Sequence, residues 1–137
     1  MDSLDGLAGR VRDAFGRIGR EKFRGDPVAN PRLTVDVLGA AVVAGVPTMV
    51  VLTPWTITGL AFPPDDVFPG ALEIAGRPRP VYRLEVTGLG TFRSVTLPTE
   101  TATLRDMTQA RGLARSWIEP FRLAVRAVVD LPVPPQG

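Results

Sequence analysis

Residues 33–55 read LTVDVLGAAVVAGVPTMVVLTPW, and they indicate a β-sheet more strongly than any other part of the chain. Apolar and polar side chains alternate at the start of this stretch, which predicts a strand over 33–43. Gly45 and Pro47 mark a turn, and the apolar run 49–53 predicts a second strand that is buried on both faces and therefore central. The longest apolar run, 38–52, is shorter than the roughly 20 residues of a membrane-spanning helix, so we expect no membrane insertion.

The segment before this stretch predicts an amphipathic helix over residues 3–23. Ser3 is a suitable N-cap, because its hydroxyl can accept a hydrogen bond from the first turn. The apolar residues recur at intervals of three and four, which places them on one helix face: Leu4, Leu7, Val11, Phe15 and Ile18. The opposite face carries arginines, which we interpret as a solvated surface.

The segments after the stretch predict an antiparallel hairpin and a helical third. Residues 81–86 and 91–97 alternate in polarity around a glycine-containing turn. Thr103 and Asp106 resemble a capping box, and Pro120 is expected to kink or restart the helix that follows. The tail 131–137 (LPVPPQG) is expected to be irregular and frayed. Together these features predict one α+β domain over 1–137. An antiparallel sheet of about four to five strands would pack against an N-terminal helix and C-terminal helices.

The composition argues against an enzyme. The 137 residues include no cysteine and no histidine, which excludes the usual thiolate and imidazole metal sites and nucleophile–imidazole pairs. General acid–base chemistry near neutral pH would depend on Asp, Glu, Tyr or the sole lysine, Lys22. We therefore expect no catalytic residues and no metal site.

The charge pattern argues against nucleic-acid binding and export. Sixteen Lys and Arg residues face 14 Asp and Glu residues, for a net charge of +2. That excess is too small and too scattered for a nucleic-acid footprint. The first 25 residues mix acids with arginines and lack a central apolar run, so we expect no secretory signal and a cytoplasmic location.

Residues 54–70 (PWTITGLAFPPDDVFPG) are the best candidate for a partner-binding surface. The segment is apolar without a period and contains four prolines, so we expect no long regular element in it. Aromatic and aliphatic side chains dominate interface hot spots, and the candidates are Trp55, Ile57, Leu60 and Phe62. A second interpretation places Trp55 in the core, where the chain leaves a strand.

Two adjacent carboxylates, Asp65 and Asp66, follow this apolar segment. Acidic side chains beside an apolar surface would suit a basic, partly apolar peptide. The alternative is a simple acidic turn on the surface.

Three segments resemble, in order and spacing, the HybE/HupJ family of [NiFe]-hydrogenase assembly chaperones. They are the N-P-x-L-x-V-x-x-x-G pattern at 30–39, the apolar strand running into Thr-Pro-Trp at 50–55, and the hairpin turn Gly-Leu-Gly-Thr-Phe at 88–92. The resemblance covers about residues 10–118, and 119–137 reads as a C-terminal extension. The chain departs from the family at Asp36, where Glu is usual, at 56–59, and at 93–98, where the family often has Cys and more aromatic residues.

The resemblance implies a chaperone without a cofactor, and no catalytic residue carries over from the family. It implies that the partners are [NiFe]-hydrogenase structural subunit precursors and possibly other maturation factors. The client would be the small subunit with its twin-arginine signal peptide, the immature large subunit, or both.

Three other functions remain as alternatives to the chaperone. A carrier of a small apolar ligand would have a pocket between sheet and helices lined by Val, Leu and Phe. An enzyme would have to work with carboxylates alone, and Asp65-Asp66 is the only adjacent acidic pair. A nucleic-acid binder would need a basic stripe with interleaved aromatic residues, which this chain lacks.

Overall fold

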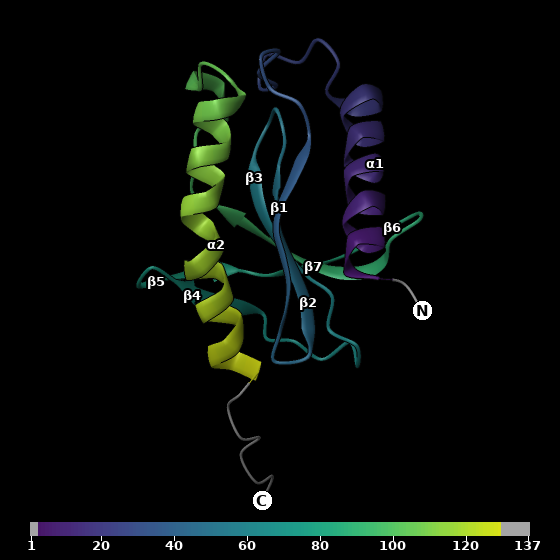
Figure 1. Ribbon diagram of the computed structural model, residues 1–137, viewed down its shortest axis with the longest axis vertical. Helices are drawn as coiled ribbons and strands as arrows, with labels where there is room; N and C mark the ends of the chain where they lie inside the picture. Colours follow the sequence, from purple (N-terminus) through teal and green to yellow (C-terminus); the bar gives the residue numbers. More distant parts are fainter. Residues whose placement is uncertain (1–2, 130–137) are drawn as a thin grey trace, which may run out of the picture.

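The computed structural model describes residues 3–129 and has the α+β architecture predicted from the sequence. A five-stranded antiparallel sheet lies between two long helices, α1 (Leu4–Lys22) and α2 (Met107–Val129), which pack on opposite faces (Figure 1). The C-terminal part of the described residues forms one long helix, within the one or two helices expected there. Within the described residues, neither helix contains a stretch that is both long enough and apolar enough to cross a membrane.

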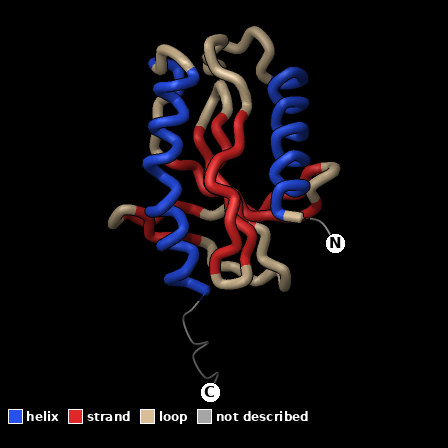
Figure 2. The backbone as a smooth tube through the Cα atoms, viewed as in Figure 1, coloured by secondary structure: helices blue, strands red, loops and turns tan. Residues whose placement is uncertain are grey.

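The main sheet consists of a three-stranded meander, β1-β2-β3, and a hairpin, β6–β7, joined by the pairing of β3 with β7 (Figure 2). Its spatial order is β1-β2-β3-β7-β6, and a separate hairpin pairs β4 with β5. The strands are β1 (Asp36–Val43), β2 (Val46–Leu52), β3 (Ile57–Ala61), β4 (Ala71–Ile74), β5 (Arg77–Pro80), β6 (Tyr82–Val86) and β7 (Gly90–Leu97). A short 3₁₀ turn, η1 (Thr101–Thr103), precedes α2.

The inner strands are apolar on both faces because each face is covered by a helix. Val50 and Leu52 belong to the core cluster under α2, whereas Met49 and Val51 belong to the cluster under α1. The prediction that the second strand is central is therefore confirmed.

Strand β3, five residues long, lies within the segment in which we expected no long regular element. It pairs with β2 on one side and β7 on the other, and all five of its residues are buried. Gly59 has no side chain because the ring of Phe121 occupies the space, with an added Cβ meeting ring carbons at 2.7–2.8 Å. Burial on both faces removes the polar–apolar alternation from which a strand is recognised.

The helix ends agree with the sequence at α1 and differ at α2. Ser3 caps α1, with its Oγ accepting from the backbone N–H of Gly6 at 2.9 Å. At α2 the cap is Asp106, which accepts from the N–H of Gln109 at 2.8 Å, so the expected cap at Thr103 is wrong. The helix also continues through Pro120 without restarting. Its second half, 119–129, buries Phe121, Ala124 and Val125, and the tail 131–137 lies outside the described residues.

Edge strand β1 is tied to both helices. The carboxylate of Asp36 forms ion pairs with Arg12 of α1 at 3.8 Å and with Arg111 of α2 at 2.9 Å. Farther along, the register shifts between Leu38 and Ala41, and Gly39 has a φ of +62°. The guanidinium of Arg122 donates to the Gly39 carbonyl at 3.1 Å.

Candidate functional site

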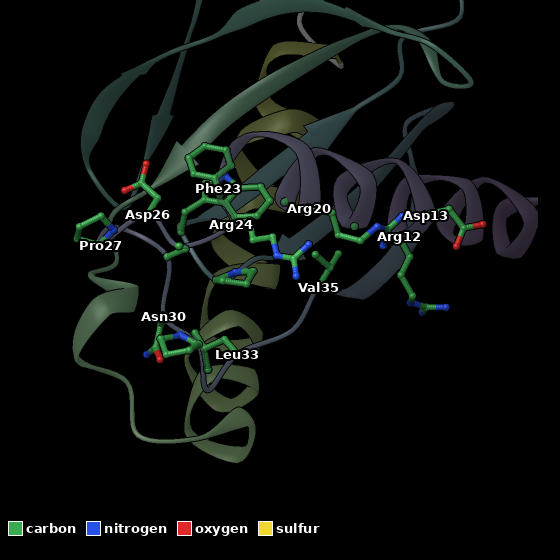
Figure 3. A pocket seen from close by; sticks show the side chains of 17 residues that line it. Arg12, Asp13, Arg20, Phe23, Arg24, Asp26, Pro27, Asn30, Leu33 and Val35 are labelled. Carbon is green, nitrogen blue, oxygen red and sulfur yellow. The ribbon is translucent and has the colours of Figure 1, made fainter.

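A surface groove of about 1080 Å³ lies beside the C-terminal half of α1. Its other walls are the loop that follows the helix, the start of β1 and the turn between β2 and β3 (Figure 3). Figure 1 shows that this loop and the start of α2 gather at the same end of the sheet. The groove contains apolar, aromatic and charged side chains, a mixture suited to binding another molecule.

The turn that carries Trp55 into the groove is organised by the Thr53 side chain. Its hydroxyl accepts from the N–H groups of Trp55 and Thr56, at 3.3 and 2.9 Å, and donates to the Thr56 carbonyl at 2.8 Å. The ring of Pro54, the residue after Thr53, fixes the φ angle of Pro54 itself. The Thr-Pro-Trp sequence is therefore a rigid support that presents one indole ring.

Asn30 fastens the opposite wall of the groove to the same turn. Its backbone N–H donates to the Pro54 carbonyl at 2.8 Å. Its side-chain amide is buried and donates to the carbonyls of Thr101 and Leu104, at 2.9 and 2.8 Å. One residue thus joins the loop after α1, the turn before β3 and the approach to α2.

Trp55 packs against the end of α1. Its ring stacks on Phe23, with centroids 4.3 Å apart and planes 5° apart. An added Cβ at Gly19 would meet the indole at 3.0 Å, so this glycine lets the indole approach the helix closely. Trp55 remains partly accessible and lines the groove, which differs from the interpretation that it fills the core.

Ile57 and Leu60 are placed in the core. Both are 0% exposed in β3, Ile57 in the cluster under α2 and Leu60 in the cluster under α1. In this conformation neither residue has any surface to offer to a partner. Both residues are close to Trp55 in the sequence, but the chain turns at Trp55 and enters strand β3, which lies in the core.

Phe62, Asp65 and Asp66 lie beyond the other end of β3, away from Trp55. Phe62 is partly buried and packs on Phe92, with ring centroids 5.4 Å apart. Asp65 is exposed, and its carboxylate accepts from the backbone N–H of Val67 at 3.1 Å. Of the six predicted residues, Trp55 therefore lies at one end of β3, Phe62, Asp65 and Asp66 lie at the other end, and Ile57 and Leu60 are buried in the strand between them.

Asp66 is already held by two arginines of this chain. Its carboxylate forms ion pairs with Arg83 at 3.0 Å and with Arg93 at 2.8 Å. Hydrogen bonds from Arg83 and then Arg93 hold the pKa of Asp66 below its ordinary value of 3.8. The Arg93 side chain is only 8% exposed, and the Asp66 carboxylate is its ion-pair partner.

Sequence reasoning missed most of the residues that line the groove. The arginines of α1 were interpreted as a solvated face. The sequence feature that pointed to the groove is the pair of family motifs at 30–39 and 50–55, because both contain residues that line it. Within residues 3–129 no group of three or more acidic side chains is placed to hold a metal ion.

Comparisons with known proteins agree with this architecture. A family model described as "[NiFe]-hydrogenase assembly, chaperone, HybE" matches residues 6–130, beyond the 10–118 over which the quoted motifs lie. Among solved structures, the solution structure of HybE from Escherichia coli aligns with a TM-score of 0.60 at 21% sequence identity, covering 96% of this chain and 85% of that chain. At this identity the likeness establishes a common fold. No curated protein matches the chain.

Proposed function

Because this chain belongs to the HybE family of [NiFe]-hydrogenase assembly chaperones, we propose that it binds hydrogenase structural subunit precursors while they mature in the cytoplasm. It acts by binding, without catalysis and without a cofactor of its own. Its clients are the small subunit with its twin-arginine signal peptide, the immature large subunit, or both, and other maturation factors can join the complex.

The groove beside Trp55 is the proposed client-binding surface. The observation that carries this assignment is that two of the motifs shared with the family, at 30–39 and 50–55, both contribute residues to the groove around one partly exposed Trp. Aromatic side chains on rigid supports are the usual centres of protein interfaces. The hydrogen bonds of Thr53 and Asn30 keep the surface formed before a client arrives, so less entropy is lost on binding.

The Asp65–Asp66 surface is the proposed contact for a basic signal peptide. Asp65 makes no ion pair within the described residues and can accept a cationic side chain. Asp66 is shared with two arginines, which reduces what it can offer. Ile57 and Leu60 contribute indirectly, because they hold the strand that separates the two surfaces.

Affinity purification of the tagged protein from hydrogenase-expressing cells tests both surfaces. We expect hydrogenase subunits in near-stoichiometric amounts with the wild type and with Arg115→Gln, an exposed control on α2. Trp55→Ala should remove most of the captured subunit. Asp65→Asn with Asp66→Asn should reduce capture only of a subunit that still carries its signal peptide. Absence of every hydrogenase subunit from the wild-type sample would contradict the proposal.

A carrier of small ligands is a second candidate, favoured by the size of the groove. Its volume is close to the upper end of the roughly 300–1,000 Å³ typical of sites for drug-sized molecules. Native mass spectrometry distinguishes the two functions, because a carrier would retain a bound small molecule after purification and a chaperone would not.

A further inference from the structure

The charges in the groove favour one sign of partner. Three arginines line it, Arg12, Arg20 and Arg24, against the two acids Asp13 and Asp26. The Asp26 carboxylate already accepts from the backbone N–H of Val28 at 2.9 Å. In Figure 3 the two acids lie toward opposite ends of the groove, and Arg20 and Arg24 lie between them.

Arg20 and Arg24 are the cations available to a ligand. Both are exposed, and neither forms an ion pair with any residue of the segment 3–129. Arg12, by contrast, lies 3.8 Å from the Asp36 carboxylate. A guanidinium presents a planar pair of donors that matches a carboxylate, so these two side chains are suited to aspartate and glutamate.

An apolar surface lies directly beside these cations. The stacked rings of Trp55 and Phe23 line the groove, as do Leu33 and Val35, which lie just before β1. A ligand that contacts the arginines can therefore bury an aromatic or aliphatic side chain at the same time. The groove is open along the surface between α1 and the loop, which suits an extended segment of a protein chain.

We propose that the groove binds an acidic segment of the client, with an apolar side chain packed on Trp55 and carboxylates paired with Arg20 and Arg24. This inference rests on the proposed chaperone function and names the chemistry of the client segment. It separates the two surfaces by charge, since a basic signal peptide would be repelled here and would be directed to Asp65 and Asp66.

Fluorescence anisotropy with short labelled peptides tests the charge preference. The probes share one central Phe and differ in charge: an Asp/Glu peptide, its Asn/Gln counterpart and a Lys/Arg counterpart. We expect the acidic peptide to bind about tenfold more tightly than the neutral one, as two partly exposed ion pairs allow. Added salt should remove much of this difference. Equal affinity for all three peptides would overturn the inference.

Charge-changing variants locate the site. Arg20→Gln with Arg24→Gln should lower affinity for the acidic peptide to that of the neutral peptide, and Arg20→Glu with Arg24→Glu should favour the basic peptide. The matched control is Arg115→Glu with Arg126→Glu, which changes two exposed arginines of α2 and should leave the affinities unchanged. An equal loss of affinity in the control variant would show that the effect comes from net charge, and it would overturn the assignment of the site to Arg20 and Arg24. Circular dichroism confirms that each variant is folded.

The outcome separates this inference from the function on which it rests. If hydrogenase subunits are captured and Trp55→Ala removes them while the arginine variants do not, the chaperone function stands and the acidic preference is wrong. If the acidic peptide binds through Arg20 and Arg24 but no hydrogenase subunit is captured, the groove chemistry stands and the client is a different protein.

Discussion

Asn30 shows how one side chain can determine the shape of a surface groove. Its amide is buried and satisfies two carbonyls near the start of α2, while its backbone holds the turn that carries Trp55. A buried carbonyl that loses its donor costs about 1–3 kcal/mol. The groove therefore depends on a residue that has little accessible surface of its own.

Asn30→Ala should lower the free energy of unfolding by about 2–4 kcal/mol, because two buried carbonyls lose their donor. Urea denaturation measures the effect. Arg32→Ala, an exposed neighbour, is the control and should change stability by less than about 0.5 kcal/mol. A loss at Asn30 no larger than at Arg32 would show that the amide does not hold the loop.

Asp66 should make stability depend on pH in the acid range. Its pKa is lowered in the fold by Arg83 and Arg93, so the ionised form stabilises the fold fully above 3.8, and this contribution is lost as the pH falls through the folded-state pKa. Asp66→Asn removes the charge but tolerates the left-handed φ of +57°. The variant should therefore unfold at lower urea concentration than the wild type near neutral pH, and the difference should shrink on acidification below 3.8.

Asp65→Asn is the matched control for that measurement. Asp65 forms no ion pair with another described residue, and an Asn side chain can still accept from the Val67 N–H. The control should change the urea midpoint little at any pH. A pH-independent difference for Asp66→Asn would show that the ion pairs with the two arginines add nothing to stability.

At the scale of elements, α1 contains glycines with two different roles. A Cβ at Gly9 would meet nothing within 4 Å, whereas a Cβ at Gly19 would meet the Trp55 ring at 3.0 Å. Both substitutions by alanine improve helix propensity by up to about 1 kcal/mol. The difference between them therefore reports on the contact between the helix and Trp55.

Gly9→Ala should raise the unfolding free energy by about 0.5–1 kcal/mol and leave client capture unchanged. Gly19→Ala should gain less or lose stability, because the indole must move, and it should weaken client capture. Thermal unfolding and affinity purification of the two variants make the comparison. Identical behaviour would show that the position of Trp55 against α1 is not important for binding.

The elements that the sequence predicts well are those with a visible period. Helix α1, with its apolar face and Ser3 cap, and the antiparallel hairpin β6–β7 both form where the sequence predicts them. Strand β3 has no such period, because helices cover both faces of the inner sheet and every residue from Ile57 to Ala61 is buried. The groove could not be predicted from the sequence either, because Arg20 and Trp55 are brought together only by the packing of α1 on the turn before β3.

At the scale of the whole molecule, the sheet joins two cores. One cluster of buried residues lies under α2 and the other under α1, and strands β2 and β3 contribute to both. A cavity on either side therefore weakens strands that the other side needs. We expect the two layers to unfold together in one cooperative transition.

Ile57→Ala and Leu60→Ala test this coupling from opposite faces of β3. Each removes a fully buried side chain and should lower the unfolding free energy by about 2–5 kcal/mol. Circular dichroism and tryptophan fluorescence should report coincident transitions for both variants. Leu123→Ala, at a side chain that is 59% exposed, is the control and should have little effect. Separate transitions for the two probes would contradict the coupling.

The open edge of β1 has a consequence for how the protein behaves at high concentration. An exposed strand edge is a template on which another chain can add a strand, and long flat edges lead to aggregation. Here the bulge at Gly39 bends the edge, and Arg122 occupies one of its carbonyls. The bulge and the Arg122 hydrogen bond thereby protect one sheet edge from pairing with other copies of this chain.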